Sequence, residues 1–218
     1  MTERGLFVTF EGLDGCGKTT QMRRLAEDLR AAGLTVIETA EPGGTAIGQG
    51  IRRILLDPAN TNMAPVAEML LYFAARAQNV AELVEPALRR GAIVLCDRWT
   101  DSTFAYQGFG RGLGTEIVDR LDEIACRGRK PDLTIWVDID LGTSLARART
   151  RERAGDGSES RFEAEAAAFF EQVRAGYQAL ERREAGRVKR VEGGGSVEEV
   201  YRRVRHAFDE AWGRTGRV

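Results

Sequence analysis

Short apolar runs recur along the chain and predict an α/β fold. Each run has the length of a strand, and segments with apolar residues at helical spacing separate consecutive runs. Such alternation is typical of a parallel sheet with helices on both faces. We therefore expect a five-stranded parallel sheet, with strands at residues 6–10, 36–40, 92–96, 133–137 and 187–191.

The first expected strand leads into a phosphate-binding loop. Residues 12–19 fit the pattern G-x-x-x-x-G-K-[ST], and a helical pattern follows them. Glycines in such a loop let several backbone N–H groups face one phosphate. Lys18 would reach the outer phosphates, and the Thr19 hydroxyl would bind Mg²⁺. The residues expected to bind ATP are Gly12, Leu13, Asp14, Gly15, Cys16, Gly17, Lys18 and Thr19.

Polar motifs also follow the second and third expected strands. They are Glu41-Pro42-Gly43-Gly44-Thr45 and Asp97-Arg98-Trp99. Ligands bind at the carboxyl ends of parallel strands, where the ends of neighbouring strands meet. Three strand ends therefore bring polar groups to one edge of the expected sheet.

Size and composition narrow the class of protein. The 218 residues favour one domain spanning residues 1–218, and 32 basic against 33 acidic residues argue against a nucleic-acid binder. No apolar stretch has membrane-spanning length, and we expect no signal peptide. Cys16, Cys96 and Cys126 are typical of reduced thiols in a cytoplasmic protein. The single histidine, His206, gives little support to histidine catalysis.

Arginine is spread over several loops, which suits phosphoryl transfer between two nucleotides. The residues are Arg52, Arg76, Arg98 and Arg111, followed by a basic segment at 147–153. Cationic side chains and magnesium hold mutually repelling phosphates in line. A nucleotide-dependent switch or assembly ATPase is the alternative from another class. The chain has neither an Asn-Lys-x-Asp box nor a Leu-Ser-Gly-Gly-Gln signature.

The chain resembles the bacterial thymidylate kinases. Besides the motifs above, the matching elements are Tyr72-Phe73-Ala74-Ala75-Arg76, Ser102-Thr103-Phe104-Ala105-Tyr106-Gln107-Gly108, Arg111-Gly112 and Lys130-Pro131-Asp132-Leu133. They occur in the family's order over nearly the whole chain. The resemblance implies a P-loop kinase fold with a mobile lid, and a cytoplasmic homodimer. It implies Mg²⁺-dependent phosphoryl transfer from ATP to thymidine monophosphate, giving ADP and thymidine diphosphate for dTTP synthesis. The alternative is another deoxynucleotide or deoxynucleoside kinase.

The resemblance also implies roles for individual residues. Phe73 would stack on thymine. The alternative is that Phe73 belongs to the core, because it shares a helical face with Leu70, Ala77 and Val80. Arg76 and Gln107 would bind the base edge, Arg98 and Arg52 the monophosphate, and Tyr106 would crowd the sugar's 2′ position. Asp14 would lie near the sugar's 3′-hydroxyl, unless it serves only the turn. The implied substrate-binding residues are Pro42, Arg52, Phe73, Arg76, Arg98, Ser102, Tyr106 and Gln107, and the metal residues are Thr19 and Asp97.

A lid is expected because Gly15 stands where some family members carry a catalytic arginine. Members without that arginine supply basic residues from a lid, here residues 147–162, which begin as a basic helix and continue into a Gly/Ser-rich tip. A solvated charged helix is the alternative. We expect the catalytic residues to be Lys18, Asp14, Arg98, Arg151 and Arg153. The family places the adenine beside the loop at residues 192–196.

Overall fold

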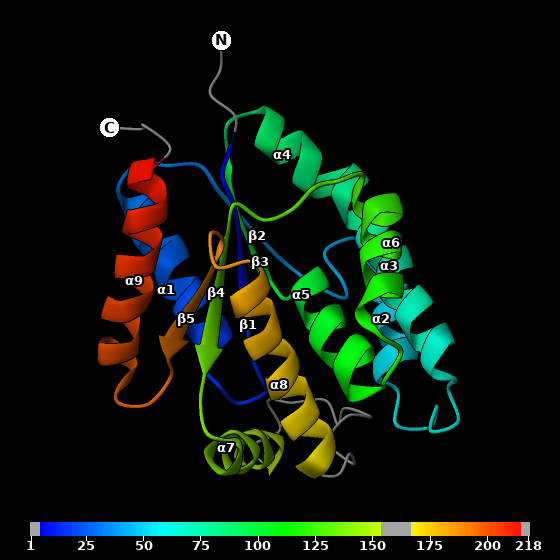
Figure 1. Ribbon diagram of the computed structural model, residues 1–218. Coiled ribbons are helices and arrows are strands. Elements are labelled where there is room, and N and C mark those ends of the chain that lie inside the picture. Colours follow the sequence, from blue (N-terminus) through cyan, green and yellow to red (C-terminus); the bar gives the residue numbers. More distant parts are fainter. Residues whose placement is uncertain (1–4, 154–166, 215–218) are drawn as a thin grey trace.

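The computed structural model describes residues 5–153 and 167–214 (Figure 1). Within them, five parallel strands form one sheet in the order β2-β3-β1-β4-β5. The predicted α/β class is confirmed, and each predicted strand boundary is within one residue of the observed one. The strands are β1 (Phe7–Glu11), β2 (Val36–Ala40), β3 (Ile93–Asp97), β4 (Leu133–Asp138) and β5 (Val188–Glu192).

The order of the strands places β1 between β3 and β4. In the sheet register, Phe10 is level with Asp97, and Glu11 is level with Trp136. The chain reverses its direction of winding on either side of β1, and this is where open parallel sheets bind ligands. The loop after β1 and the turn after β3 are therefore neighbours.

Helices cover both faces of the sheet (Figure 1). One face carries α1 and α9, and the other carries most of the remaining helices, whereas α7 lies beyond the carboxyl ends of the strands. The predicted basic helix at 147–153 forms the last part of α7. The helices are α1 (Lys18–Ala31), α2 (Ala46–Leu56), α3 (Pro65–Asn79), α4 (Glu85–Arg89), α5 (Thr100–Thr103), α6 (Thr115–Cys126), α7 (Leu141–Arg153), α8 (Ala167–Arg183) and α9 (Val197–Arg214), with π-helical segments η1 (Val80–Val84) and η2 (Phe104–Gly110).

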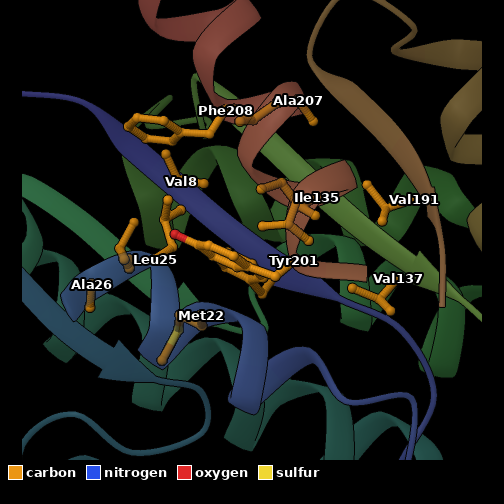
Figure 2. Close-up of a cluster of buried hydrophobic side chains, with 14 of the residues drawn as sticks. Val8, Met22, Leu25, Ala26, Ile135, Val137, Val191, Tyr201, Ala207 and Phe208 are labelled. Atoms are coloured by element: carbon orange, nitrogen blue, oxygen red, sulfur yellow. The ribbon is translucent and has the colours of Figure 1, made fainter. Parts of the chain in front are cut away.

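The core between the sheet and the pair α1 and α9 is apolar (Figure 2). There, Val8 and Ile135 of the sheet lie against Leu25 of α1 and Phe208 of α9. Burial on both faces explains the nearly continuous apolar strands. None of the described helices combines the length and apolar character needed to cross a bilayer.

Candidate active site

The phosphate-binding loop has a backbone shape that depends on glycine. Gly12 has φ 138°, and a Cβ atom there would lie 2.5 Å from the Val137 carbonyl oxygen. Gly17, with φ 93°, precedes the first turn of α1, and no side chain caps that turn. The first N–H groups of α1 therefore remain available for an anion, which the positive end of the helix also favours.

Lys18 and Arg98 meet at the Asp14 carboxylate. Arg98 Nη2 donates to Asp14 Oδ1 over 2.8 Å, and Lys18 Nζ lies 3.5 Å from the same oxygen. Ser144, at the start of α7, donates to the Asp14 carbonyl oxygen over 2.5 Å. The loop, the turn after β3 and α7 are thus joined at one residue.

Thr19 and Asp97 lie together, as the sequence predicts for a magnesium site. The Thr19 hydroxyl donates to Asp97 Oδ2. The other Asp97 oxygen is buried, accepts no hydrogen bond from described residues, and lies 4.0 Å from Lys18 Nζ. A hydroxyl and a carboxylate oxygen are suitable ligands for Mg²⁺, which retains waters and binds phosphates. Within the described ranges, no group of three or more His, Cys, Asp or Glu side chains is arranged so that it could hold a metal ion by itself.

Arg98 occupies an unusual backbone conformation, with φ 70°. Such a value is uncommon outside glycine and persists only where neighbouring groups fix it. The Arg98 N–H donates to the Phe10 carbonyl over 2.9 Å. The next N–H, of Trp99, donates to Glu11 Oε1 over 2.7 Å. Both restraints come from the end of β1.

Glu11 is a fully buried carboxyl that binds three elements. Besides the Trp99 N–H, it accepts hydrogen bonds from Ser102 over 2.5 Å and from Tyr177 of α8 over 2.9 Å. Burial and the nearby Asp101 carboxylate raise the pKa of Glu11 from 4.5 to about 7. This carboxyl therefore titrates near neutral pH, unlike an exposed glutamate.

Arg76 and Phe73 form a second, deeply buried part of the site. The Arg76 guanidinium lies 4.9 Å from the Phe73 ring centroid, and its Nε lies 3.2 Å from Glu41 Oε2. Arg76 Nη2 donates to Thr103 over 3.1 Å, whereas Nη1 has no hydrogen-bond partner among the described residues. Burial raises the pKa of Glu41 to about 7, although Arg76 and Asn79 act against that rise. A buried cation with an unused donor is suited to binding a polar ligand.

Tyr106 and Gln107 lie side by side in η2, and both are buried. The Tyr106 ring lies 5.0 Å from the Arg98 guanidinium, and its hydroxyl accepts from Arg98 over 3.4 Å. Arg98 also donates to Ser102 over 3.1 Å. Three of the predicted substrate residues, Arg98, Ser102 and Tyr106, therefore lie in direct contact.

Arg52 approaches the site from α2 and donates to the Pro42 carbonyl over 2.9 Å. The expectation that the arginines lie in loops is wrong for Arg52 and Arg76, which lie within α2 and α3. Long side chains on these packed helices reach the site from a more rigid base than a loop provides.

Trp99 is fully buried. Its ring is edge-on to that of Phe7, with the two ring centroids 4.9 Å apart.

A pocket of about 300 Å³ adjoins the phosphate-binding loop. It includes Arg147 of α7 and part of the loop at residues 192–196, which the sequence predicts as the adenine wall. The side chains of Arg151 and Arg153 and residues 154–162 of the expected lid lie outside the described residues. The lining residues are Gly15, Cys16, Gly17, Thr20, Gln21, Arg147, Gly193, Gly195, Val197 and Val200.

Sequence reasoning assigned no role to Glu11, Glu41 or Tyr177. Glu11 directly precedes the phosphate-binding loop and Glu41 begins the motif at residues 41–45. Each stands directly after an apolar run, and that position was the available signal. Tyr177 lies in a helical pattern distant in sequence, and only the fold brings it to Glu11.

A phosphate-binding loop at the switch point of a parallel sheet, joined to the half-buried Arg98 and accompanied by the buried Arg76, defines a P-loop nucleotide kinase. Comparison with known proteins specifies the family. The thymidylate kinase family profile matches residues 10–204, so the chain belongs to the thymidylate kinase family.

Individual thymidylate kinases are similar to this chain over most of their length. The chain is 51% identical to the thymidylate kinase of Pelobacter propionicus over 197 residues, covering 90% of each chain. It is 50% identical to that of Geobacter sulfurreducens, covering 89% of this chain and 92% of the relative. The crystal structure of thymidylate kinase from Ehrlichia chaffeensis superposes with a TM-score of 0.75 at 29% identity, covering 94% of this chain and 99% of the other.

The titration of Glu11 predicts a pH-dependent stability. Between pH 4.5 and about 7 the native carboxyl holds a proton that the unfolded carboxyl has released. The contribution of Glu11 to stability should therefore fall as pH rises through this window and level off above it. Glu11→Gln stays neutral, so its free energy of unfolding relative to wild type should rise over the same window.

Urea unfolding at a series of pH values measures this difference. Glu27→Gln, at an exposed position of α1, is the control and should show a flat difference. A flat difference for Glu11→Gln as well would contradict the assignment.

Proposed function

We propose that this protein transfers the terminal phosphoryl group of magnesium-bound ATP to thymidine monophosphate, giving ADP and thymidine diphosphate. Family membership supports the reaction. The observation that carries the proposal is the 2.8 Å contact between Arg98 and Asp14. It joins the loop that would bind the donor to the arginine that would bind the acceptor, so both phosphates would meet beside Lys18.

On the donor side, the N–H groups at the start of α1 would hold the phosphates, with the adenine in the pocket beside Arg147. Lys18 would contact the oxygens of the transferred group and stabilise their charge. Thr19 and Asp97 would hold Mg²⁺, directly or through water. The bound metal would neutralise part of the phosphate charge.

On the acceptor side, the thymine ring would lie against Phe73, with Arg76 and Gln107 at its edge. Arg98 and Arg52 would hold the monophosphate, close to Pro42 and Ser102. Tyr106 would fill the space beside the sugar's 2′ carbon and so favour deoxyribose. Close positioning of the two substrates would supply much of the rate enhancement, because binding already restricts the translation and rotation of the reacting groups.

The lid at residues 147–162 would supply charge that the phosphate loop lacks at Gly15. Support comes from Arg147, which lines the donor pocket at the start of this segment. Arg151 follows Arg147 by one turn of α7. Lid closure would bring arginine to the transferred phosphoryl group and exclude water.

The proposal extends to a single domain over residues 1–218, acting as a cytoplasmic homodimer. The three cysteines are buried and unpaired, as expected in a reducing compartment. Exposed apolar side chains support self-association. Helices α2 and α3 pack together and carry four apolar side chains that are 46% to 58% exposed, those of Ile47, Ile54, Val66 and Leu70.

Sedimentation should show a dimer for wild type and a monomer for Leu70→Glu.

The reaction is tested by coupled measurement of ADP release with a panel of acceptors. The panel contains thymidine, thymidine monophosphate, its ribonucleotide analogue, and the other deoxynucleoside monophosphates. Thymidine monophosphate should be the preferred acceptor. Preference for a nucleoside, or for another deoxynucleotide, would identify the alternative kinase class, and equal ADP release without an acceptor would identify an ATPase.

Replacing Lys18 by alanine should lower turnover by about 10²–10³-fold, because one preorganised charge donor is lost. Folding should be little affected, since backbone conformation maintains the loop. Steady-state kinetics and thermal unfolding measure the two effects. Near-normal turnover in a folded variant would contradict the role assigned to the loop.

Replacing Arg151 and Arg153 together by alanine should lower turnover by about 10³-fold or more, as for other arginine groups that reach phosphoryl oxygens. Thymidine monophosphate binding should be unchanged, because that site lies on α3 and the turn after β3. Single variants then show which arginine acts.

The matched control for the lid is Arg89→Ala with Arg90→Ala. Both residues are exposed, and α4 lies at the opposite end of the sheet from α7 (Figure 1). Normal turnover in the lid double variant would assign the catalytic charge elsewhere, with Arg147 and Arg149 as the next residues to test. Loss of monophosphate binding would instead place the segment in the acceptor site.

A further inference from the structure

Glu68 is a fully buried carboxylate in the first turn of α3. Its Oε1 accepts a hydrogen bond from Gln107 Nε2 over 2.7 Å. Arg111, which follows η2, donates to both Glu68 oxygens over 3.3 Å. The Arg111 guanidinium also lies 4.8 Å from the Phe169 ring centroid. The carboxylate is therefore paired with a cation that is itself packed in place.

We propose that Glu68 is a positioning residue that fixes the orientation of the Gln107 amide and thereby determines which pyrimidine base the acceptor site selects. An amide has an oxygen end that accepts and a nitrogen end that donates, whereas a carboxylate paired with arginine only accepts. Turning the Gln107 amide over would place two acceptor oxygens against each other, at the cost of a buried hydrogen bond. Gln107 Nε2 therefore faces Glu68, and Oε1 is left as the acceptor.

Arg76 carries an unused donor and binds the residue directly before η2. Arg76 binds Thr103, which precedes Gln107 by about one turn of the same segment. Its Nη1 has no described hydrogen-bond partner, and Gln107 donates from Nε2 to Glu68, which leaves Oε1 as the acceptor end. The site therefore offers an acceptor from η2 and a donor from α3.

This pair complements thymine and opposes cytosine. Thymine carries an N3–H donor next to its C4 carbonyl, whereas cytosine carries an N3 acceptor next to a C4 amino group. A site built to bond one pattern rejects the reverse, because buried polar groups are then left unpaired. The inference rests on the proposed function. It adds that Glu68 determines which end of the Gln107 amide faces the base.

The test is Glu68→Gln, which keeps the side-chain volume but can accept or donate. Either orientation of the Gln107 amide then finds a partner. We expect KM for thymidine monophosphate to rise about tenfold and the preference over deoxycytidine monophosphate to fall at least tenfold. The kcat with thymidine monophosphate should stay within about twofold, because the phosphate contacts are untouched.

The matched control is Glu82→Gln. Glu82 accepts from Gln78 Nε2 over 2.8 Å at an exposed position, so the substitution makes the same change in the same kind of pair away from the site. Its KM and base preference should equal those of wild type. Unchanged KM and preference in folded Glu68→Gln would overturn the proposal, as would a fall in kcat alone.

A double variant, Glu68→Gln with Gln107→Glu, separates orientation from packing. It exchanges the two groups, so position 107 offers only acceptors in either orientation, and the preference for thymidine monophosphate should return. Loss of preference in the folded double variant would overturn the proposal, even where Glu68→Gln alone does not fold. A wild-type protein without activity on thymidine monophosphate would instead refute the proposed function.

Discussion

The arrangement of the site depends on one buried carboxyl, that of Glu11. A carboxyl without hydrogen bonds is expensive to bury, and the donors around Glu11 offset that cost. Those donors come from the turn after β3, from α5 and from α8. Because Glu11 ends β1 at the centre of the sheet, it ties elements on both sides of the phosphate loop to one point.

The conformation of Arg98 follows from this restraint. A left-handed arginine backbone stores strain that neighbouring contacts must overcome. Hydrogen bonds from residues 98 and 99 to the end of β1 hold the turn, and the side chain then reaches Asp14. A cation that is already placed loses little conformational freedom when an anionic phosphate binds. Arg76, paired with Glu41, follows the same principle in the deeper part of the site.

The sequence predicted the strands and the phosphate loop well, because both depend on local patterns. Apolar runs mark strands buried on both faces, and the glycine spacing of the loop reflects its backbone geometry. Helical spacing was less reliable in α3: Leu70 is 48% exposed although Phe73 on the same predicted face is 4% exposed. Which apolar residue of a helix is buried depends on the elements packed against it, and the spacing of apolar residues alone does not identify those elements.

The partners of the buried carboxylates could not be predicted from the sequence. An isolated glutamate usually indicates a solvated surface position, and Glu68 also fits the common preference for acidic residues in the first helical turn. Its actual environment depends on η2 and Arg111, about 40 residues later. Glu11 needs Tyr177, which is 166 residues away in sequence. Such groups acquire their roles only when distant segments meet.

The π-helical form of η2 explains how one short segment supplies several neighbouring site residues. Phe104 to Gly108 are all buried, because α8 and α6 pack against this segment. The close approach of α8 depends on Gly176, where a Cβ atom would lie 2.8 Å from Ala105 Cα. Wide π turns are frequent at functional sites. Here the wide turn places adjacent Tyr106 and Gln107 toward Arg98 and Glu68, respectively, so the residues proposed to serve the phosphate and the base share one backbone segment. A change in the packing of α8 would therefore alter the proposed sugar and base contacts together.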